Sequence, residues 1–440
     1  MRRTAFVLLF FACCTAVAAA DADPLANWPH WRGPLADGSA PNANPPVKWD
    51  ATTNVRWKAE IRGKGSSTPV VWGDRVFVTT AVKTDRVAKP DELPVPDPKF
   101  KLVPPPPTNF YKFVVLCYDR GTGKLLWEKV AAERLPHEGT HETHSYAGGS
   151  PTTDGKFLYL SFGSAGTFCY DFDGNQKWKR DLGVMHTRLG WGEAVTPVIA
   201  GGSLLVNYDQ EADSALYCLD AATGKDRWVA KRDEKTTWNV PLVVEFGGKT
   251  QVVTSGTTRV RSYDLATGDL IWQCARMTVN PIPSPVRVGD SVVCMSGYKG
   301  SAVVSVPLGS TGDLGTDGKV NWRYGTGTPY VPSPAVVGSR LYFTGGNGEM
   351  LTVLDAKTGK PVIDQERLPQ VKSFYGSPAT AAGRVYFTDR SGVTVVLKAG
   401  DALDVLSVNK LGEPVDASPV LVGKQLFLRG ERTLFCIEER

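Results

Sequence analysis

The chain has 440 residues, of which 42% are hydrophobic and 10% aromatic, so it can bury a large core. Its formal net charge is +5, and Arg2 and Arg3 near the amino terminus supply two of those charges. This small charge excludes the basic surface typical of nucleic-acid-binding proteins, so we expect no nucleic-acid partner.

Residues 1–20 have the pattern of a cleaved export signal. A basic pair, Arg2 and Arg3, precedes an apolar stretch over 5–17, and the small residues Ala18 and Ala20 precede a cleavage site. We therefore expect an exported protein of the periplasm or cell envelope. After the signal, no stretch approaches the roughly 18 consecutive apolar residues of a membrane span, so no transmembrane span is expected.

Residues 21–53 are rich in proline, glycine and tryptophan and show no periodicity. Trp28, Trp31 and Trp49 are the largest side chains of this segment. Rings of this size need a partner surface to be buried. The composition therefore predicts an irregular but ordered arm that packs on a larger domain.

From residue 54 to residue 440 the chain repeats one unit, seen most clearly over Leu216 to Trp228. An apolar strand runs into Asp220, a turn closes on Thr223 and Gly224, and a second strand carries the tryptophan. Aspartate accepts turn N–H groups and glycine supplies a positive φ, so each unit contains a β-hairpin. The structural tryptophans of the units are Trp57, Trp127, Trp178, Trp228, Trp272 and Trp322.

Each unit opens with a small residue and a proline that begin an apolar strand. After one interval of 82 residues, these prolines recur every 41 to 49 residues, at Pro69, Pro151, Pro197, Pro241, Pro285, Pro334, Pro378 and Pro419. This period is typical of four-stranded propeller blades. The long interval contains one turn only, so it holds one blade with a Pro-rich insertion over 82–111. The insertion is either a variable surface loop or an arm that docks a partner.

The eighth unit ends at Arg440 with three strands and no fourth. A strand over Asn54 to Ile61 precedes the first unit and carries Trp57 at the position of a blade tryptophan. Pairing the two removes an open sheet edge. The sequence thus predicts an all-β, eight-bladed β-propeller of four-stranded antiparallel blades, in which the N-terminal strand closes the last blade.

The cysteines do not form a disulfide framework. Cys13 and Cys14 lie in the export signal, and Phe10 and Phe11 occupy the small-residue box that a lipid anchor needs. Four others stand two residues before the turn acids of separate repeats, too far apart to bond: Cys117, Cys169, Cys218 and Cys436. We expect these to be small buried residues. The sequence leaves open whether Cys274 and Cys294 form a disulfide.

The D-x-x-T-G-K-x-x-W hairpins and S-P-V strands resemble the pyrroloquinoline-quinone-like (PQQ-like) repeat of eight-bladed propellers. Three types of protein share this repeat: quinoprotein dehydrogenases, the propeller lipoprotein of the outer-membrane β-barrel assembly machinery, and exported bacterial propellers. The opening Asn27 to Pro34 (NWPHWRGP) is most similar to the third type. The resemblance implies the fold, whereas the function depends on the site.

Quinoprotein dehydrogenases of this kind hold the quinone between a tryptophan and a disulfide of adjacent cysteines, with calcium bound by Glu, Asn and Asp. Here the only adjacent cysteines are Cys13 and Cys14, in the export signal, and no C-x-x-C-H haem motif occurs. We therefore expect no cofactor and assign no catalytic residue. PQQ with calcium, and hence a quinone-dependent dehydrogenase, is the alternative.

Ligand-binding candidates stand just before the S-P of each unit, because these connections gather around the mouth of a propeller channel. They are Tyr146, Trp191, Glu193, Trp238, Asn239, Asn280, Tyr330, Tyr375 and Asp416. Aromatic rings with amides and acids suit a sugar ring or a peptide side chain, although the same rings could pack the throat. We expect a monomeric, non-catalytic binding or scaffold protein for a protein or glycan partner, with an outer-membrane assembly factor as an alternative.

Two further clusters are candidate ion sites. His137, His141 and His144 share one loop, and their nitrogens suit zinc-like ions, but the H-x3-H-x2-H spacing equally fits local hydrogen bonding. Asp209 and Glu211 are paired acids of a possible calcium or hydrolase site, for which solvation of a turn is the simpler explanation.

Overall fold

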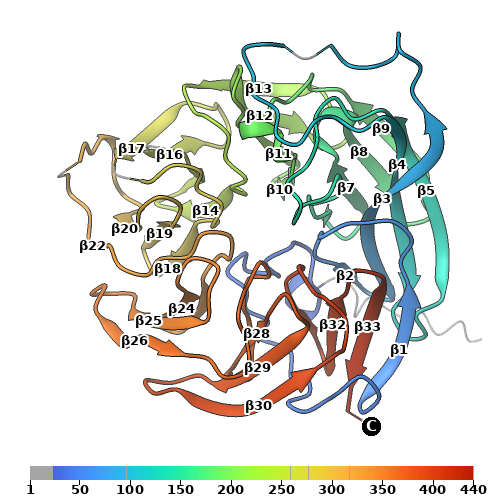
Figure 1. Cartoon of the computed structure of the whole chain (residues 1–440). Coiled ribbons are helices and arrows are strands. Elements are labelled where there is room, and N and C mark those ends of the chain that lie inside the picture. The colour runs from blue at the N-terminus through green and yellow to red at the C-terminus, as the bar shows by residue number, and fades with distance from the viewer. Residues whose placement is uncertain (1–22, 96, 258, 276, 317, 440) are drawn as a thin grey trace, which may run out of the picture.

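Eight β-sheets surround a central axis in the computed structural model (Figure 1). The structure describes residues 23–95, 97–257, 259–275, 277–316 and 318–439. The predicted export signal over residues 1–20, with Cys13 and Cys14, lies outside these residues. Across the described ranges, no helix is long and apolar enough to span a membrane.

The first four blades follow one another along the chain, each from its inner to its outer strand. They are β2 (Val70–Trp72), β3 (Arg75–Val87), β4 (Asn109–Asp119) and β5 (Leu125–Arg134); β6 (Thr152–Thr153), β7 (Phe157–Ser161), β8 (Thr167–Asp171) and β9 (Gln176–Arg180); β10 (Val198–Ala200), β11 (Ser203–Tyr208), β12 (Ser214–Asp220) and β13 (Asp226–Arg232); and β14 (Leu242–Phe246), β15 (Lys249–Ser255), β16 (Arg259–Asp264) and β17 (Leu270–Ala275).

The other four blades continue this order around the ring. They are β18 (Val286–Val288), β19 (Ser291–Ser296), β20 (Ala302–Pro307) and β22 (Trp322–Tyr324); β23 (Ala335–Val337), β24 (Arg340–Thr344), β25 (Met350–Asp355) and β26 (Pro361–Arg367); β27 (Ala379–Ala381), β28 (Arg384–Thr388), β29 (Val393–Lys398) and β30 (Asp404–Lys410); and β31 (Val420–Val422), β32 (Gln425–Arg429), β33 (Thr433–Glu438) and β1 (Val55–Glu60). Short 3-10 helices lie at Pro24–Ala26, Gly163–Ala165 and Arg188–Gly190.

The last blade closes as predicted. Strand β1 pairs antiparallel with β33, and Trp57 stands opposite Cys436. The other three tryptophans that face a cysteine are Trp127, Trp178 and Trp228, opposite Cys117, Cys169 and Cys218. A small residue here leaves room for the indole. All six cysteines of the described chain are buried thiols, so Cys274 and Cys294 form no disulfide.

Five of the blade tryptophans link their own blade to the turn of the next one. Trp178 donates from Nε1 to the carbonyl of Ala221 at 2.9 Å, and its ring covers Gly224. The corresponding bonds of Trp57, Trp127, Trp228 and Trp322, to Arg120, Phe172, Leu265 and Ala356, measure 2.8 to 2.9 Å. The turn glycine therefore serves the neighbouring blade as well as its own hairpin.

Trp272 departs from this pattern because the next repeat lacks the D-x-x-T-G turn. Its Nε1 donates to Gln251 in its own blade at 3.2 Å. The longer loop of the next blade instead supplies β21 (Gly312–Asp313), which pairs parallel with β17 and makes this sheet five-stranded. One sheet thus has a fifth, parallel strand in addition to the four antiparallel strands that were predicted. This strand comes from the loop that replaces the missing turn.

A ring of hydrogen bonds encircles the axis at the start of the inner strands. The residue before each proline donates its N–H to the hydroxyl of the equivalent residue in the next blade. The donors are Thr68, Ser150, Val240, Ser284, Ser333, Ser377 and Ser418, with distances of 2.9 to 3.2 Å. The hydrogen bond from Thr196 N–H to residue 240 is missing, because Val240 has no hydroxyl. The small residues of the S-P motif therefore join blades.

The arm over 21–53, described from Asp23, enters the channel and contacts blades on several sides. Trp28 pairs with Val71 of β2, and Ser39 pairs with Thr380 of β27. The buried guanidinium of Arg32 donates to the carbonyls of Pro378 and Pro334 at 2.8 and 2.6 Å. The arm thus ties inner strands of blades 1, 6 and 7 together.

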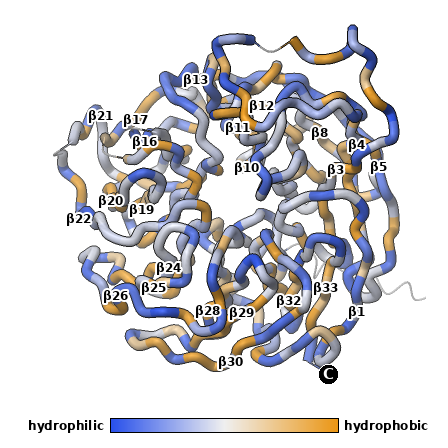
Figure 2. Tube along the Cα trace, viewed as in Figure 1, coloured by the Kyte–Doolittle hydropathy of each residue, from blue (hydrophilic) through white to orange (hydrophobic). Residues whose placement is uncertain are grey.

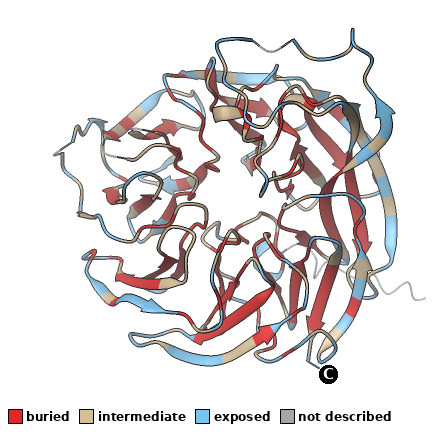
Figure 3. Cartoon of the chain, in the orientation of Figure 1, coloured by how far each residue is buried: buried red, intermediate tan, exposed pale blue. Residues whose placement is uncertain are grey.

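The predicted insertion over 82–111 overlaps the outer ends of two strands. Strand β3 continues to Val87 and β4 begins at Asn109. Val82 pairs with Lys112, and Lys83 pairs with Tyr111. Backbone pairing of the two strands therefore continues into a part of the sheet that is not buried on both faces. The loop exposes apolar residues such as Val95, and the outer strands are also the exposed ones (Figures 2 and 3).

The contact between Trp178 and Gly224 yields a matched pair of substitutions. Gly224 and Gly383 have φ values of +70° and +69°, but only Gly224 would place a Cβ against the indole, at 2.7 Å. Gly383→Ala should cost about 1–3 kcal/mol of folding free energy, from backbone strain alone. Gly224→Ala should cost about 1–3 kcal/mol more because of overpacking. Denaturant unfolding of both variants measures the difference, and equal losses would contradict the inter-blade contact.

The arm should loosen in acid through His30. Burial, and secondarily the charge of Arg32, lowers the pKa of His30 to about 3, against 6.5 for a free imidazole. A lowered folded pKa means that this stability is complete above pH 6.5 and is lost as the pH falls towards the folded value. At pH 5 the loss should be about 2 kcal/mol, since each pH unit corresponds to about 1.4 kcal/mol. Unfolding curves at pH 7.5 and pH 5 should show this loss in the wild type and a smaller one in His30→Gln.

Candidate functional site

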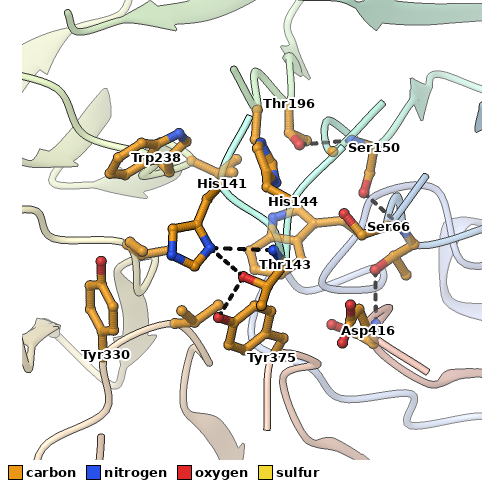
Figure 4. A pocket seen from close by; sticks show the side chains of 18 of the residues that line it. Ser66, His141, Thr143, His144, Ser150, Thr196, Trp238, Tyr330, Tyr375 and Asp416 are labelled. Atoms are coloured by element: carbon orange, nitrogen blue, oxygen red, sulfur yellow. Dashed lines mark hydrogen bonds between the residues drawn. The ribbon is translucent and has the colours of Figure 1, made fainter. Parts of the chain in front are cut away.

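A cavity of about 470 Å³ lies on the propeller axis, at the mouth formed by the connections that precede the S-P motifs. Five of the predicted rim residues line it: Trp191, Trp238, Tyr330, Tyr375 and Asp416. Trp31 from the arm also lines this cavity, which we call the axial pocket (Figure 4). The arm thus contributes to the site as well as to the fold.

One wall of the axial pocket is a continuous group of aromatic rings. Trp191 and Trp238 stack at 6.4 Å with 22° between their planes, and Tyr298 meets the edge of Trp191 at 6.2 Å. Tyr298 in turn stacks on Tyr330 at 4.8 Å. Trp238 Nε1 donates to the carbonyl of Gly192 at 2.8 Å, which fixes the ring. Mutual contact holds these rings in place, so they form a preorganised apolar surface.

A polar group beside these rings is already hydrogen-bonded, and its His141 meets Trp191 with ring centroids 5.8 Å apart. His141 Nδ1 lies 2.8 Å from the hydroxyl of Thr143, which lies 2.9 Å from the hydroxyl of Tyr375 (Figure 4). Arg390 stacks over Tyr375 at 4.2 Å and forms an ion pair with Asp416 at 2.7 Å. Asp416 is the one acid among the residues that line the axial pocket.

His144 and Tyr330, two half-buried titratable groups of the axial pocket, are neutral near pH 7. Burial lowers the pKa of His144 to about 4, and its Nε2 lies 3.1 Å from the carbonyl oxygen of Glu193. A neutral imidazole therefore donates this bond from Nε2. Burial also raises the pKa of Tyr330 to about 12, so its hydroxyl keeps its proton.

The remaining predicted rim residues lie elsewhere. Tyr146 and Glu193 line a second cavity of about 240 Å³. Asn239 is buried and joins two blades, since it donates to the carbonyl of Pro283 and accepts from Ser255 N–H. Asn280 is buried with a φ of +54°. None of these four residues is among those that line the axial pocket.

The sequence prediction missed the rings of Trp31 and Tyr298. Tyr298 lies in the turn between β19 and β20, and turns between second and third strands share a face with the S-P connections. This topology could have indicated that Tyr298 lies at the same mouth of the channel as the predicted residues. Trp31 carried no such signal, because the docking site of an aperiodic arm does not follow from the repeat.

The three predicted metal histidines do not stay together. His141 and His144 line the axial pocket, whereas His137 lines the second cavity beside Glu138. Burial raises the pKa of Glu138 to about 7, assisted by the charge of Glu193, and burial raises that of Glu193 to about 7.

The paired acids Asp209 and Glu211 have structural partners. Asp209 forms a fully buried ion pair with Arg232 at 2.7 Å and accepts from the hydroxyl of Thr237 at 2.8 Å. Glu211 accepts from the hydroxyl of Thr236 at 2.8 Å. These contacts account for both acids, so neither an ion nor simple turn solvation is needed to explain them.

The axial pocket does not fit the quinone site that the PQQ-like repeat implies. No cysteine lines this pocket, and the six cysteines of the described chain lie singly inside the blades. The one acid there, Asp416, is neutralised by Arg390, an unfavourable neighbour for calcium. The donor set therefore differs from that of the quinoprotein dehydrogenases.

Comparison with known proteins agrees with this architecture. The family model PQQ_2, described as outer membrane protein assembly factor BamB, matches residues 112–323 and 313–439. No curated protein sequence matches the chain. BamB from Moraxella catarrhalis superposes with a TM-score of 0.52 at 12% identity, covering 82% of this chain and 98% of that one. Quinohemoprotein alcohol dehydrogenase from Comamonas testosteroni superposes with a TM-score of 0.60 at 11% identity, covering 95% and 81%. At these identities the structures share the fold alone.

Proposed function

The chain belongs to the PQQ_2 family of BamB-like propellers, and from its axial pocket we propose that it is a non-catalytic binding protein for a protein or glycan partner. The observation that carries the proposal is the preorganised wall of Trp191, Trp238, Tyr298 and Tyr330 in a cavity of about 470 Å³. A volume of this order suits a small saccharide or a few side chains.

The aromatic and polar parts of the axial pocket suit a ligand that carries both apolar and polar groups. Aromatic rings stack on the C–H face of a sugar or on a planar side chain, and here the rings are already positioned. His141, Thr143 and Tyr375 add hydroxyl and imidazole groups beside these rings. Preorganisation lowers the entropy cost of binding, which favours recognition by this surface.

Two titratable groups of the axial pocket support binding rather than catalysis. Asp416 is held by Arg390, and His144 is half-buried with its Nε2 proton engaged. A general acid or base needs a proton that it can exchange with a substrate at hydrogen-bond distance. These two groups are committed to protein partners.

The family match favours a second candidate, an assembly-type scaffold. The PQQ_2 family is described by an outer membrane protein assembly factor, and a scaffold would present loops or strand edges to its partner. Exposed apolar residues on outer strands, such as Leu126, Val229 and Leu270, would serve such contacts. In both cases we propose export to the periplasm or cell envelope through residues 1–20.

Binding to the axial pocket is tested with two defined probe sets, an oligosaccharide array and a library of short peptides rich in aromatic and aliphatic residues. Hits are titrated by intrinsic tryptophan fluorescence. Trp238→Ala and Tyr330→Ala should weaken binding by about tenfold or more, since each removes an anchoring ring. Tyr217→Ala, which removes a half-buried tyrosine of β12, is the control and should leave the affinity unchanged.

Three results would count against the proposal. Binding that survives both pocket variants would move the contact to the outer blade surface and favour the scaffold. A lack of binding in both probe sets would reject the axial pocket as a site for these ligands. Dye-linked oxidation of an alcohol or sugar after addition of quinone and calcium would replace the binding protein by an enzyme.

A further inference from the structure

His137, Glu138 and Glu193 line the second cavity, and His186 lies beside it. His137 and Glu138 come from the connection between blades 1 and 2, His186 from the loop after β9, and Glu193 from just beyond it. The candidate ligand atoms of His137, Glu138 and His186 all lie within 4.8 Å of one another. His137 Nε2 lies 3.8 Å from Glu138 Oε2 and 3.9 Å from Glu193 Oε1.

From this geometry we propose a divalent transition-metal site, of the zinc class, formed by His137, Glu138 and His186. Two imidazoles with one carboxylate are a ligand set that zinc accepts, whereas calcium and magnesium prefer oxygen ligands throughout. Glu193 borders this group on the side of His137, with its Oε1 3.9 Å from His137 Nε2.

Small movements complete the coordination. Zinc bonds of about 2.0–2.2 Å place neighbouring ligand atoms roughly 3.3 Å apart, so the present atoms must approach by up to about 1.5 Å. Rotation of His137 and His186, both only half-buried, supplies this movement. His137 Nε2 also lies 2.7 Å from the carbonyl oxygen of Met185, and coordination through Nε2 would replace that hydrogen bond.

The carboxylates are held in place by surrounding groups. Thr187 donates from both its N–H and its hydroxyl to Glu138, and Ser164 does the same to Glu193, with both latter bonds at 2.6 Å. Glu138 is buried, with 2% of its surface exposed. Hydrogen bonds of this kind, from neighbouring groups to the ligands of a metal, orient those ligands and tune metal affinity.

The Pro-rich insertion covers one side of this cluster. Phe100 stacks on His186 with ring centroids 4.1 Å apart, and Val103 N–H donates to the carbonyl of Leu189 at 2.7 Å. The insertion therefore limits the positions open to His186. This gives the insertion a role that is independent of the axial pocket.

Zinc titration of the chelator-washed full chain tests the proposal. Calorimetry with elemental analysis should show one equivalent of tightly bound zinc, and cobalt in its place should give the intense visible bands of a tetrahedral site. His186→Gln, His137→Gln and Glu138→Gln should each weaken binding by about tenfold or more. Phe100→Ala should weaken it less, because the ring restrains a ligand without being one.

His141→Gln is the matched control, since His141 belongs to the same loop but lines the axial pocket. It should bind zinc as the wild type does. Less than one equivalent in the wild type, unchanged affinity in His186→Gln, or loss of the site in His141→Gln would each overturn the proposal. If Glu138→Gln does not melt cooperatively, His186→Gln decides, because half-exposed His186 is not needed for the core.

Discussion

Contact between neighbouring blades is the constraint on which this structure depends. One blade buries its strands against the next, and the ring persists only if every interface is filled. Two kinds of contact fill each interface between blades, at different distances from the axis. Near the outside, an indole covers the turn glycine of the next blade and donates to its backbone. Near the axis, a hydroxyl accepts the N–H of the preceding blade.

The hydroxyl contacts near the axis also determine where a ligand could bind. Small Ser and Thr side chains before each proline hold the inner strands together without filling the channel, so a cavity remains on the axis. The arm enters this channel and places Trp31 in the cavity wall. Of the hydroxyl positions, Val240 alone replaces the polar group by an apolar one, and it too lines the axial pocket. The ring is therefore interrupted between the two blades whose preceding connections carry Trp191 and Trp238.

The two cavities divide the chemistry of the chain. The axial pocket is aromatic, and its one acid, Asp416, is neutralised by Arg390, which suits recognition of a ring or side chain. The second cavity gathers two carboxylates and the imidazole of His137, with His186 beside it under the insertion, which suits a cation. His137 and His141 are only four residues apart in the sequence, yet they belong to different sites. The connection that carries them crosses from one cavity to the other.

The repeat by itself determined the number of blades, the closing strand and the position of each blade tryptophan. Those features depend on contacts between equivalent positions, so the period reveals them. The period also placed five rim residues in the axial pocket, because every S-P connection reaches the same face. The period did not determine the path of the arm, the end of β3, the formation of β21 by the longer loop, or the proximity of His137 to His186. These depend on segments that differ from one blade to the next, and only tertiary packing brings such segments together.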